Sequence, residues 1–344
     1  MLLAVTLGVG LTGCGPSDNS DGTDDPGSKQ GQVVLSGAGA TFPSPVYASW
    51  TYNYTESTKN QVLVNYQGTG SGAGINQLKA GTVDFAGTDA PLTQSELDEA
   101  GLIQFPMLSG GVVVVVNLPG IENGKLKLSQ KTLADIFMGK IQKWNDPVVV
   151  KENPKTTLPE SDITVVHRSD SSGTSFLFTH YLAQISPEWK EKVGEGKTVN
   201  WPVGIGGQKN PGVCNNVAKI SGAIGYTEYT YAVETKLAMA SLENAAGQYV
   251  TPSIESFTEA LKSASWKAEE GFYQVVTNAS GEKSYPLVGI TYILLNKDLE
   301  STKKDNLVNY IDWCFDAGKN IAVKMNYVPI PDTAIAVIRP VLEK

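Results

Sequence analysis

The feature of this chain that most constrains its fold is a repeated alternation between short apolar runs and helical segments. Loops rich in glycine, serine and threonine join the runs to the helices. One run, Val112–Val116, is β-branched throughout, which is typical of a strand that is covered on both faces. Alternating strands and helices predict an α/β fold with doubly wound lobes. The 344 residues are enough for two lobes with separate cores.

The same pattern predicts the individual elements. Thr93 and Glu96 form a capping box that begins one helix, and Pro43 suits the start of another because the first N–H groups of a helix lack partners anyway. We expect lobe 1 to comprise residues 33–108 and 287–344, and lobe 2 to comprise residues 109–286. The predicted strands cover 33–36, 61–66, 83–86, 102–106, 111–117, 163–166, 223–226 and 285–295. The predicted helices cover 43–50, 73–79, 133–138, 174–182, 307–317 and 333–342, besides the helix that begins at the capping box.

The first residues predict export and a lipid anchor. Residues 1–11 are almost wholly apolar but too short to span a bilayer, and Leu11-Thr-Gly-Cys14 follows at once. This resembles a bacterial lipobox, in which residues 1–13 are a signal peptide and Cys14 is lipidated. Residues 14–32 are rich in Gly, Ser, Asp and Pro and are expected to form a disordered tether. The alternative is a plain secretory signal with a chance cysteine.

Cys214 and Cys314 remain, and an oxidising compartment would permit a disulfide between them. We expect none. Cys214 is predicted on a helix of lobe 2 and Cys314 on a helix of lobe 1. A disulfide between them would prevent the hinge motion that we expect between the lobes. Two buried, apolar thiols are the preferred interpretation.

Composition excludes some function classes. The formal net charge is -8, which argues against general affinity for nucleic acid or anionic membranes. Only two histidines, His167 and His180, and two arginines, Arg168 and Arg339, are present. So few such side chains offer little for acid–base catalysis or metal ligation, and we expect no catalytic residue, no metal and no cofactor. An anionic ligand would need a local, well-aimed site.

Three loops between a strand and a helix share one chemistry. Each places small hydroxyl residues and glycines where a helix begins, and the unpaired N–H groups and dipole of a helix start attract anions. In open α/β sheets, ligands bind at the carboxyl ends of strands, where these loops lie. Taken singly, each loop is better explained as a simple helix cap. The loops are Gly39-Ala-Thr-Phe42, Thr69-Gly-Ser-Gly72 and Ser171-Ser-Gly-Thr174.

Arg168-Ser-Asp170 precedes the third loop and sharpens the prediction. The arginine offers a rigid fork of donors that suits a tetrahedral oxyanion, and Asp170 could hold the guanidinium in place. The alternative is a surface ion pair at a strand end, which would contribute little. In a chain with two arginines, we favour an oxyanion site.

Several motifs together resemble the phosphate-binding proteins of bacterial phosphate ABC transporters, from about Val33 to the C-terminal helix. The resemblance implies a type II periplasmic-binding-protein fold, in which two lobes joined by a hinge close on the ligand. It is carried by Gly37-Ala-Gly-Ala-Thr-Phe-Pro43, Tyr66-Gln-Gly-Thr-Gly-Ser71, Val83-Asp-Phe-Ala-Gly-Thr-Asp-Ala-Pro-Leu92, Arg168-Ser-Asp-Ser-Ser-Gly-Thr-Ser-Phe176, Trp201-Pro-Val-Gly-Ile-Gly-Gly207 and Gly222-Ala-Ile-Gly-Tyr226.

The resemblance also implies the ligand contacts. One departure from the family pattern is His167, where a second basic residue is usual, and we expect it to change only the rim of the cleft. Asp89 would accept the proton of a phosphate hydroxyl and repel sulfate, which has no proton to share. The implied set is Thr41, Phe42 (through its N–H), Ser71 and Asp89 from lobe 1, with Arg168, Ser172, Gly173 and Thr174 from lobe 2 and Asp170 bracing Arg168.

The expected function is therefore high-affinity capture of inorganic phosphate for an ABC transporter permease, by a monomer. It would work outside the cytoplasm, lipid-anchored in the periplasm or on the outer face of the cell membrane. Arsenate shares the proton of phosphate and stays an alternative ligand. A phosphatase or serine hydrolase is disfavoured, because Ser71 lacks a G-x-S-x-G elbow and Gly194-Glu-Gly-Lys-Thr198 has Glu191 where a P-loop needs glycine. A surface protein with a role other than transport also remains open.

Overall fold

The computed structural model describes residues 31–342, and its main sheet runs through the whole molecule. Ten strands take part in it, in the order β2-β1-β3-β12-β4-β8-β6-β7, and β13 and β9 each pair with β4. These strands are β1 (Val33–Gly39), β2 (Val62–Gly68), β3 (Phe85–Thr88), β4 (Leu102–Val116), β6 (Thr164–Arg168), β7 (Ile205–Gly207), β8 (Ala223–Glu228), β9 (Ala238–Met239), β12 (Val288–Asn296) and β13 (Val328–Pro329).

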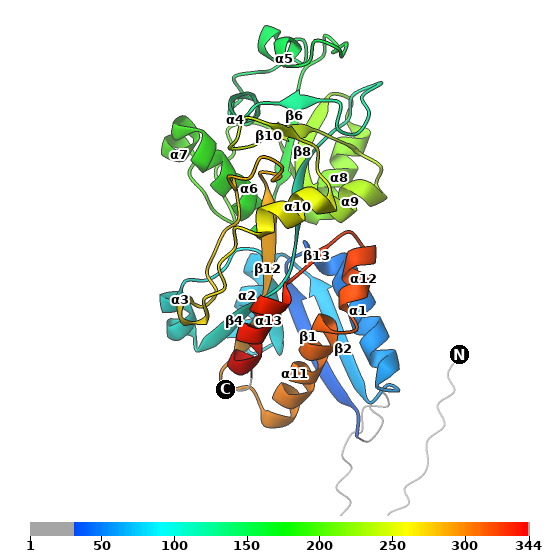
Figure 1. Cartoon of the computed structure of the whole chain (residues 1–344), viewed down its shortest axis with the longest axis vertical. Helices are drawn as coiled ribbons and strands as arrows, with labels where there is room; N and C mark the ends of the chain where they lie inside the picture. Colours follow the sequence, from blue (N-terminus) through cyan, green and yellow to red (C-terminus); the bar gives the residue numbers. More distant parts are fainter. Residues whose placement is uncertain (1–30, 343–344) are drawn as a thin grey trace, which may run out of the picture.

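Strand β4 joins two parts of this sheet. Its residues Leu102–Gly111 pair with β12, whereas Val112–Val116 pair with β8. We call the part that contains β1, β2 and β3 the first half and the part that contains β6, β7 and β8 the second half. Figure 1 shows the halves stacked along the long axis, with β4 and β12 between them. The change of partner lies between Gly111 and Val112. We expected lobe 2 to begin at residue 109, and the lobe bounds stay a prediction.

The prediction of two strands over 102–106 and 111–117 was wrong, because β4 is one strand of 15 residues. Proline cannot donate to a strand ladder and is disfavoured inside a strand. In the fold, Leu108 faces Thr291 and Pro106 faces Tyr292, which leaves one extra residue in β4 between them. Such a bulge interrupts the ladder locally and accommodates a proline inside a longer strand.

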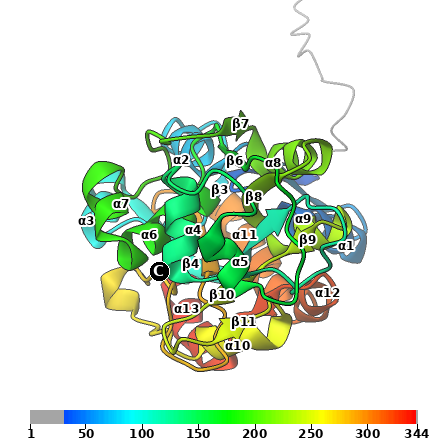
Figure 2. The ribbon, with the colours of Figure 1, turned by 90° about the horizontal axis from the view of Figure 1, so that it is seen from above.

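Helices surround the sheet when the molecule is seen from above (Figure 2). A separate sheet of β5 (Lys127–Leu128), β10 (Ser241–Glu243) and β11 (Tyr249–Val250) lies in the second half. The arrangement is the α/β fold with two wound halves that the alternation predicted. The helices are α1 (Ser44–Ser57), α2 (Ser71–Lys79), α3 (Gln94–Ala100), α4 (Gln130–Phe137), α5 (Pro147–Glu152), α6 (Gly173–Ile185), α7 (Pro187–Lys192), α8 (Lys209–Lys219), α9 (Tyr229–Glu234), α10 (Ile254–Leu261), α11 (Ser301–Phe315), α12 (Lys319–Lys324) and α13 (Asp332–Leu342), with a 3-10 turn at Ala268–Glu270.

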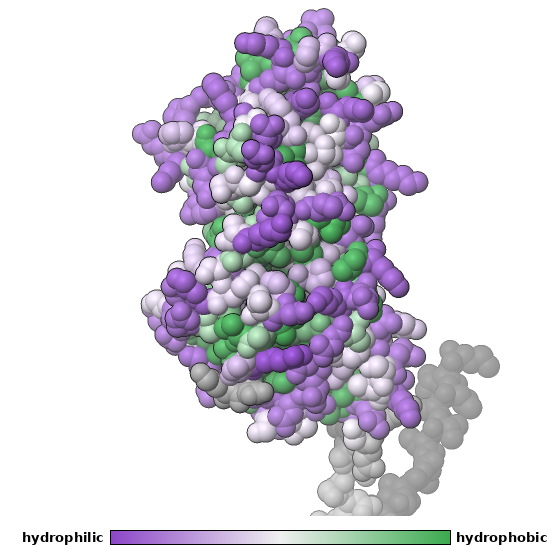
Figure 3. All heavy atoms as spheres, in the orientation of Figure 1, coloured by the Kyte–Doolittle hydropathy of each residue, from purple (hydrophilic) through white to green (hydrophobic). Residues whose placement is uncertain are grey.

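The core follows the apolar runs of the sequence. Val112–Val116 is at most 1% exposed, which confirms that both faces of this strand are covered. Thr93 and Glu96 form the predicted capping box at the start of α3. The face of the molecule in Figure 3 is largely hydrophilic, with apolar residues in small groups.

Cys214 on α8 and Cys314 on α11 are buried, unbonded thiols, as predicted. The predicted signal peptide, the lipidated Cys14 and most of the tether lie outside the described residues. Among the helices described between residues 31 and 342, none is long and apolar enough to cross a membrane.

Candidate functional site

The first of the three predicted loops follows β1. Gly39 has φ +144° and lies so close to β3 that a Cβ there would come within 2.1 Å of the Gly87 oxygen. The Ala40 N–H donates to that same oxygen at 2.8 Å, which turns the chain toward α1. Thr41 and Phe42 follow and are both buried, and the Thr41 hydroxyl has no hydrogen-bond partner.

The second loop follows β2 and ends at Ser71, the first residue of α2. Gly70 has φ +98°, a left-handed conformation that a glycine adopts without strain. The Ser71 Oγ accepts the N–H of Asp89 at 3.4 Å and the N–H of Gly173 at 3.1 Å. Because both bonds use its lone pairs, the hydroxyl proton stays available for another acceptor.

Asp89 follows β3 and is 1% exposed. Its Oδ1 accepts the Thr291 hydroxyl of β12 at 2.8 Å, whereas its Oδ2 is buried without a hydrogen-bond partner. Burial raises the pKa of Asp89 to about 7, against the lowering effects of the Thr291 hydrogen bond and the positive charge of Arg168. Near neutral pH this carboxyl can therefore accept a shared proton or supply one.

Arg168 is the last residue of β6, and its side chain is 1% exposed. Its guanidinium donates to both oxygens of Asp170, from Nε at 2.7 Å and from Nη2 at 2.5 Å, and Nη1 donates to the Asn210 Oδ1 at 3.2 Å. Burial alone would raise the pKa of Asp170, but the bonds from Arg168 and the Lys209 N–H hold it below its ordinary value. The expected bracing of Arg168 by an ionised Asp170 is present.

The third loop begins α6. The Ser172 hydroxyl is the N-cap and accepts the Ser175 N–H at 3.1 Å, and Gly173 and Thr174 form the first turn. The cap uses a lone pair of Ser172 and leaves its proton free to donate. A Cβ at Gly173 would lie 2.7 Å from atoms of Asp89, so only glycine allows the halves to approach this closely here.

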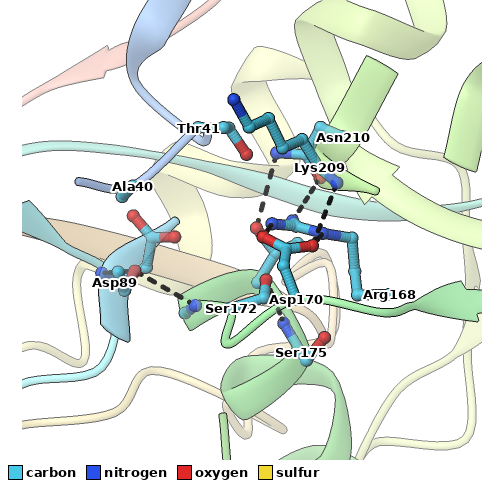
Figure 4. A network of polar contacts seen from close by, with 12 residues as sticks. Ala40, Thr41, Asp89, Arg168, Asp170, Ser172, Ser175, Lys209 and Asn210 are labelled. Carbon is cyan, nitrogen blue, oxygen red and sulfur yellow. Dashed lines mark hydrogen bonds and ion pairs between the residues drawn. The ribbon is translucent and has the colours of Figure 1, made fainter. Parts of the chain in front are cut away.

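The loops of the two halves meet each other. The Gly72 N–H donates to the Ser171 oxygen at 3.2 Å, beside the bond from the Gly173 N–H to Ser71. Figure 4 shows Thr41 and Asp89 on one side and Arg168 with Asp170 on the other. The structure thus brings all nine predicted site residues to one place, although their roles toward a ligand stay predictions.

Several residues that support the site were not predicted. The Tyr226 hydroxyl accepts the Arg168 N–H at 3.1 Å and bonds the Ser175 hydroxyl at 2.6 Å. Asn210 and Thr291 hold Arg168 and Asp89, and each lies on an element far along the chain from its partner. The motif that ends at Tyr226 was noted without a role, and no local pattern pointed to the other two.

His167, which stands where a second basic residue is usual, packs against an aromatic ring. Its ring stacks on Trp201 with centroids 4.8 Å apart, and burial lowers the pKa of the ring. Within residues 31–342, no three His, Cys, Asp or Glu side chains gather in a way that could hold a metal ion.

Comparisons with known proteins place the chain in a family. Residues 23–317 match the family model of the PBP superfamily domain. The chain is 45% identical over 345 residues to the phosphate-binding protein PstS of Xylella fastidiosa (strain Temecula1), covering 97% of this chain and 94% of that protein. It is 49% identical over 308 residues to PstS of Haemophilus influenzae, covering 89% and 91%.

Solved structures show the same fold. A phosphate-binding protein from Stenotrophomonas maltophilia superposes with a TM-score of 0.67 at 19% sequence identity, covering 90% of this chain and 94% of that one. At that identity the likeness establishes the fold, and the sequence relatives establish the family. The chain therefore belongs to the PstS family of phosphate-binding proteins within the PBP superfamily.

Proposed function

We propose that this chain captures inorganic phosphate between its two halves and presents it to the membrane permease of an ABC transporter. The observation that carries this is the pairing of a buried donor with a buried acceptor across the site. Arg168 comes from the second half and Asp89 from the first, and neither is more than 3% exposed. An anion that keeps a proton satisfies both, because it accepts from the guanidinium and donates to the carboxyl.

The remaining contacts are donors. The Thr41, Ser71 and Ser172 hydroxyls and the Phe42 N–H supply O–H and N–H groups, and Thr174 adds its own at the start of α6. The Gly173 N–H already donates to the Ser71 Oγ, so Gly173 contributes through its close backbone approach. The number of donors suits four oxygens of one tetrahedral anion, and the α6 dipole adds partial positive charge. Asp170 keeps the Arg168 fork in one orientation, so little side-chain freedom is lost when the anion binds.

Selectivity follows from the proton. Phosphate near neutral pH keeps at least one proton that can bridge to the Asp89 Oδ2. Sulfate of the same shape brings none, so an ionised Asp89 would face it as a buried like charge. No step of this function breaks a covalent bond, in keeping with a family of binding proteins rather than enzymes.

The test is the stability of the protein with and without ligand. The protein is first unfolded and refolded in phosphate-free buffer to strip bound anion, and its melting temperature is then measured with added phosphate or with chloride at equal ionic strength. Free phosphate at about 1,000 times its Kd should stabilise the fold by about 4 kcal/mol. A folded protein that melts at the same temperature in both salts would contradict the proposal.

We further propose that the chain acts as a monomer held by a lipid on Cys14, in the periplasm or on the outer face of the cell membrane. The lipobox-like Leu11-Thr-Gly-Cys14 supports the anchor. Changing Cys14→Ser should move the protein from the membrane fraction to the soluble fraction. If the variant and the original chain both stay with the membrane, the anchor proposal is wrong.

A further inference from the structure

We infer that the hydroxyls of Tyr231 and Tyr327 are positioning groups for the phosphate site, and that the Tyr231 hydroxyl does this across the two halves. This inference rests on the proposed function. The two tyrosines hold successive backbone carbonyls of the first loop, at Thr41 and Phe42. They contact the backbone oxygens of the loop and are not among the residues expected to contact the anion.

The first contact is the hydrogen bond from the Tyr231 hydroxyl to the Thr41 oxygen, at 2.7 Å. A trans peptide is planar, and its C=O and N–H point in opposite directions. Fixing the Thr41 oxygen therefore fixes the direction of the Phe42 N–H, which is one of the expected phosphate donors. The Ser44 N–H also reaches the Thr41 oxygen, at 3.3 Å, but it lies in the same segment and does not tie the loop to the second half.

The second contact fixes the next peptide. The Tyr327 hydroxyl donates to the Phe42 oxygen at 2.8 Å and lies 3.1 Å from the Glu228 Oε2. The Tyr327 hydroxyl has one proton and cannot donate to both oxygens at once. Its contact with Glu228 is therefore a hydrogen bond when the Glu228 carboxyl is protonated and donates to the Tyr327 hydroxyl. Burial raises the pKa of Glu228 to about 8, which keeps it protonated at neutral pH.

The position of Tyr231 makes its bond depend on the approach of the halves. Tyr231 lies on α9, directly after β8 of the second half, whereas Thr41 follows β1 of the first. Next to it, the Thr230 hydroxyl donates to the Met325 oxygen at 2.9 Å, again between α9 and the C-terminal segment of the first half. We infer that both bonds form only when the halves are together, as they are in this structure, so that they add to the stability of the closed form alone.

The experiment compares Tyr231→Phe and Tyr327→Phe with Tyr285→Phe. Tyr285 is the matched control, because its hydroxyl is buried without a hydrogen-bond partner and its loss removes no bond. Phosphate association and dissociation rates are measured by stopped flow on the refolded, full-length proteins, together with the melting temperature without phosphate. Each variant removes one oxygen atom and leaves the ring in place.

Tyr231→Phe should raise the dissociation rate of phosphate about tenfold, as for a lost hydrogen bond to a buried carbonyl, with little change in the association rate. Its melting temperature without phosphate should match that of the unmodified chain, because the bond forms only in the closed state. Tyr327→Phe should weaken binding in the same direction, and Tyr285→Phe should bind as the unmodified chain does.

An unchanged dissociation rate in Tyr231→Phe would overturn the inference while leaving the proposed function intact, provided that the unmodified chain binds phosphate. A large drop in the melting temperature of the phosphate-free variant would also overturn it, since that result marks a purely structural hydroxyl. If the unmodified chain itself binds no phosphate, both the inference and the proposed function fall.

Discussion

At the scale of single residues, the site depends on side chains that are buried and held in fixed orientations. Arg168 is held by Asp170 and Asn210, and Asp89 is held by Thr291. Preorganisation of this kind reduces the entropy lost on binding. We therefore expect that a substitution which keeps the charge of one of these side chains but changes its shape weakens phosphate binding.

Arg168→Lys tests the fork. Lysine keeps the charge but cannot donate from a rigid planar fork, so phosphate affinity should fall about a hundredfold or more. Isothermal titration calorimetry measures the change. Arg339→Lys is the matched control, because Arg339 is the other arginine of the sequence and pairs with Asp312 and Asp316 on α11 and next to it. Equal losses in both variants would contradict a special role for Arg168.

The pKa of Asp89 predicts a pH effect on selectivity. Its pKa is raised to about 7, so the carboxyl is protonated below that pH and can donate to a fully ionised anion. Sulfate affinity should therefore rise as the pH falls through about 7, while phosphate keeps its advantage at higher pH. Titrations with sulfate at about pH 6 and about pH 8 check this sign. A sulfate affinity that does not change with pH would contradict the role of Asp89.

At the scale of elements, three loops converge because the strands that precede them end on the same side of the sheet. Parallel pairing of β1 with β2 and β3 places the first two loops and Asp89 side by side in the first half. The third loop follows β6 in the second half and contacts the second loop. Glycines at the ends of the strands let the loops of the two halves touch. Substitutions at the contact between these loops should therefore affect closure of the halves without affecting the fold of either half.

Gly173→Ala tests that contact. The new Cβ would lie 2.7 Å from Asp89, a clash that arises only when the halves are together. Phosphate affinity should drop at least about tenfold, while the melting temperature without phosphate should stay or rise slightly, since alanine favours helices over glycine. Gly212→Ala on α8 is the control, because its nearest neighbour would be 3.3 Å away. Tight binding by Gly173→Ala would contradict the closed geometry.

Local patterns predicted the longer strands, the helices α1 to α4, α6, α8, α11 and α13, and all three loops, because hydrophobic periodicity and capping are properties of short segments. The short strands β5, β7, β9, β10, β11 and β13 and the helices α5, α7, α9, α10 and α12 were not predicted. The single strand β4 was missed, since the bulge that admits Pro106 is set by its partner β12 and not by its own sequence. Asp89, Arg168 and Asp170 could be predicted from their motifs. Thr291, Asn210 and Tyr231 could not, because their contacts with the site cross more than one element of the tertiary fold.

At the scale of the whole molecule, a second buried carboxyl links the halves. Glu228 is fully buried and accepts the Thr230 N–H with both oxygens at 3.0 Å, next to Tyr327. Its pKa is raised from its ordinary 4.5 to about 8. Between these values the folded chain binds a proton that the unfolded chain releases, so the free energy of unfolding should decrease as the pH rises through this window.

Glu228→Gln tests this effect, because the amide keeps the shape and cannot titrate. Urea unfolding at about pH 5.5 and about pH 8, at fixed phosphate, should show a loss of stability of more than about 1 kcal/mol in the unmodified chain and a smaller loss in the variant. Glu152→Gln is the control, since Glu152 is also hydrogen-bonded and lies away from the boundary between the halves. If the free energy of unfolding changes with pH by the same amount in the unmodified chain and in Glu228→Gln, Glu228 is not the group that causes the change.

The measurement that tests the central claim most directly is a calorimetric titration of the stripped and refolded protein at a pH above the pKa of Asp89. One sample is titrated with phosphate and a separate sample with sulfate. The account predicts tight one-to-one binding of phosphate and no heat from sulfate, with the gap between the anions narrowed in Asp89→Asn. No binding of phosphate by the folded protein would contradict the function. Equal binding of both anions would contradict the role of the shared proton.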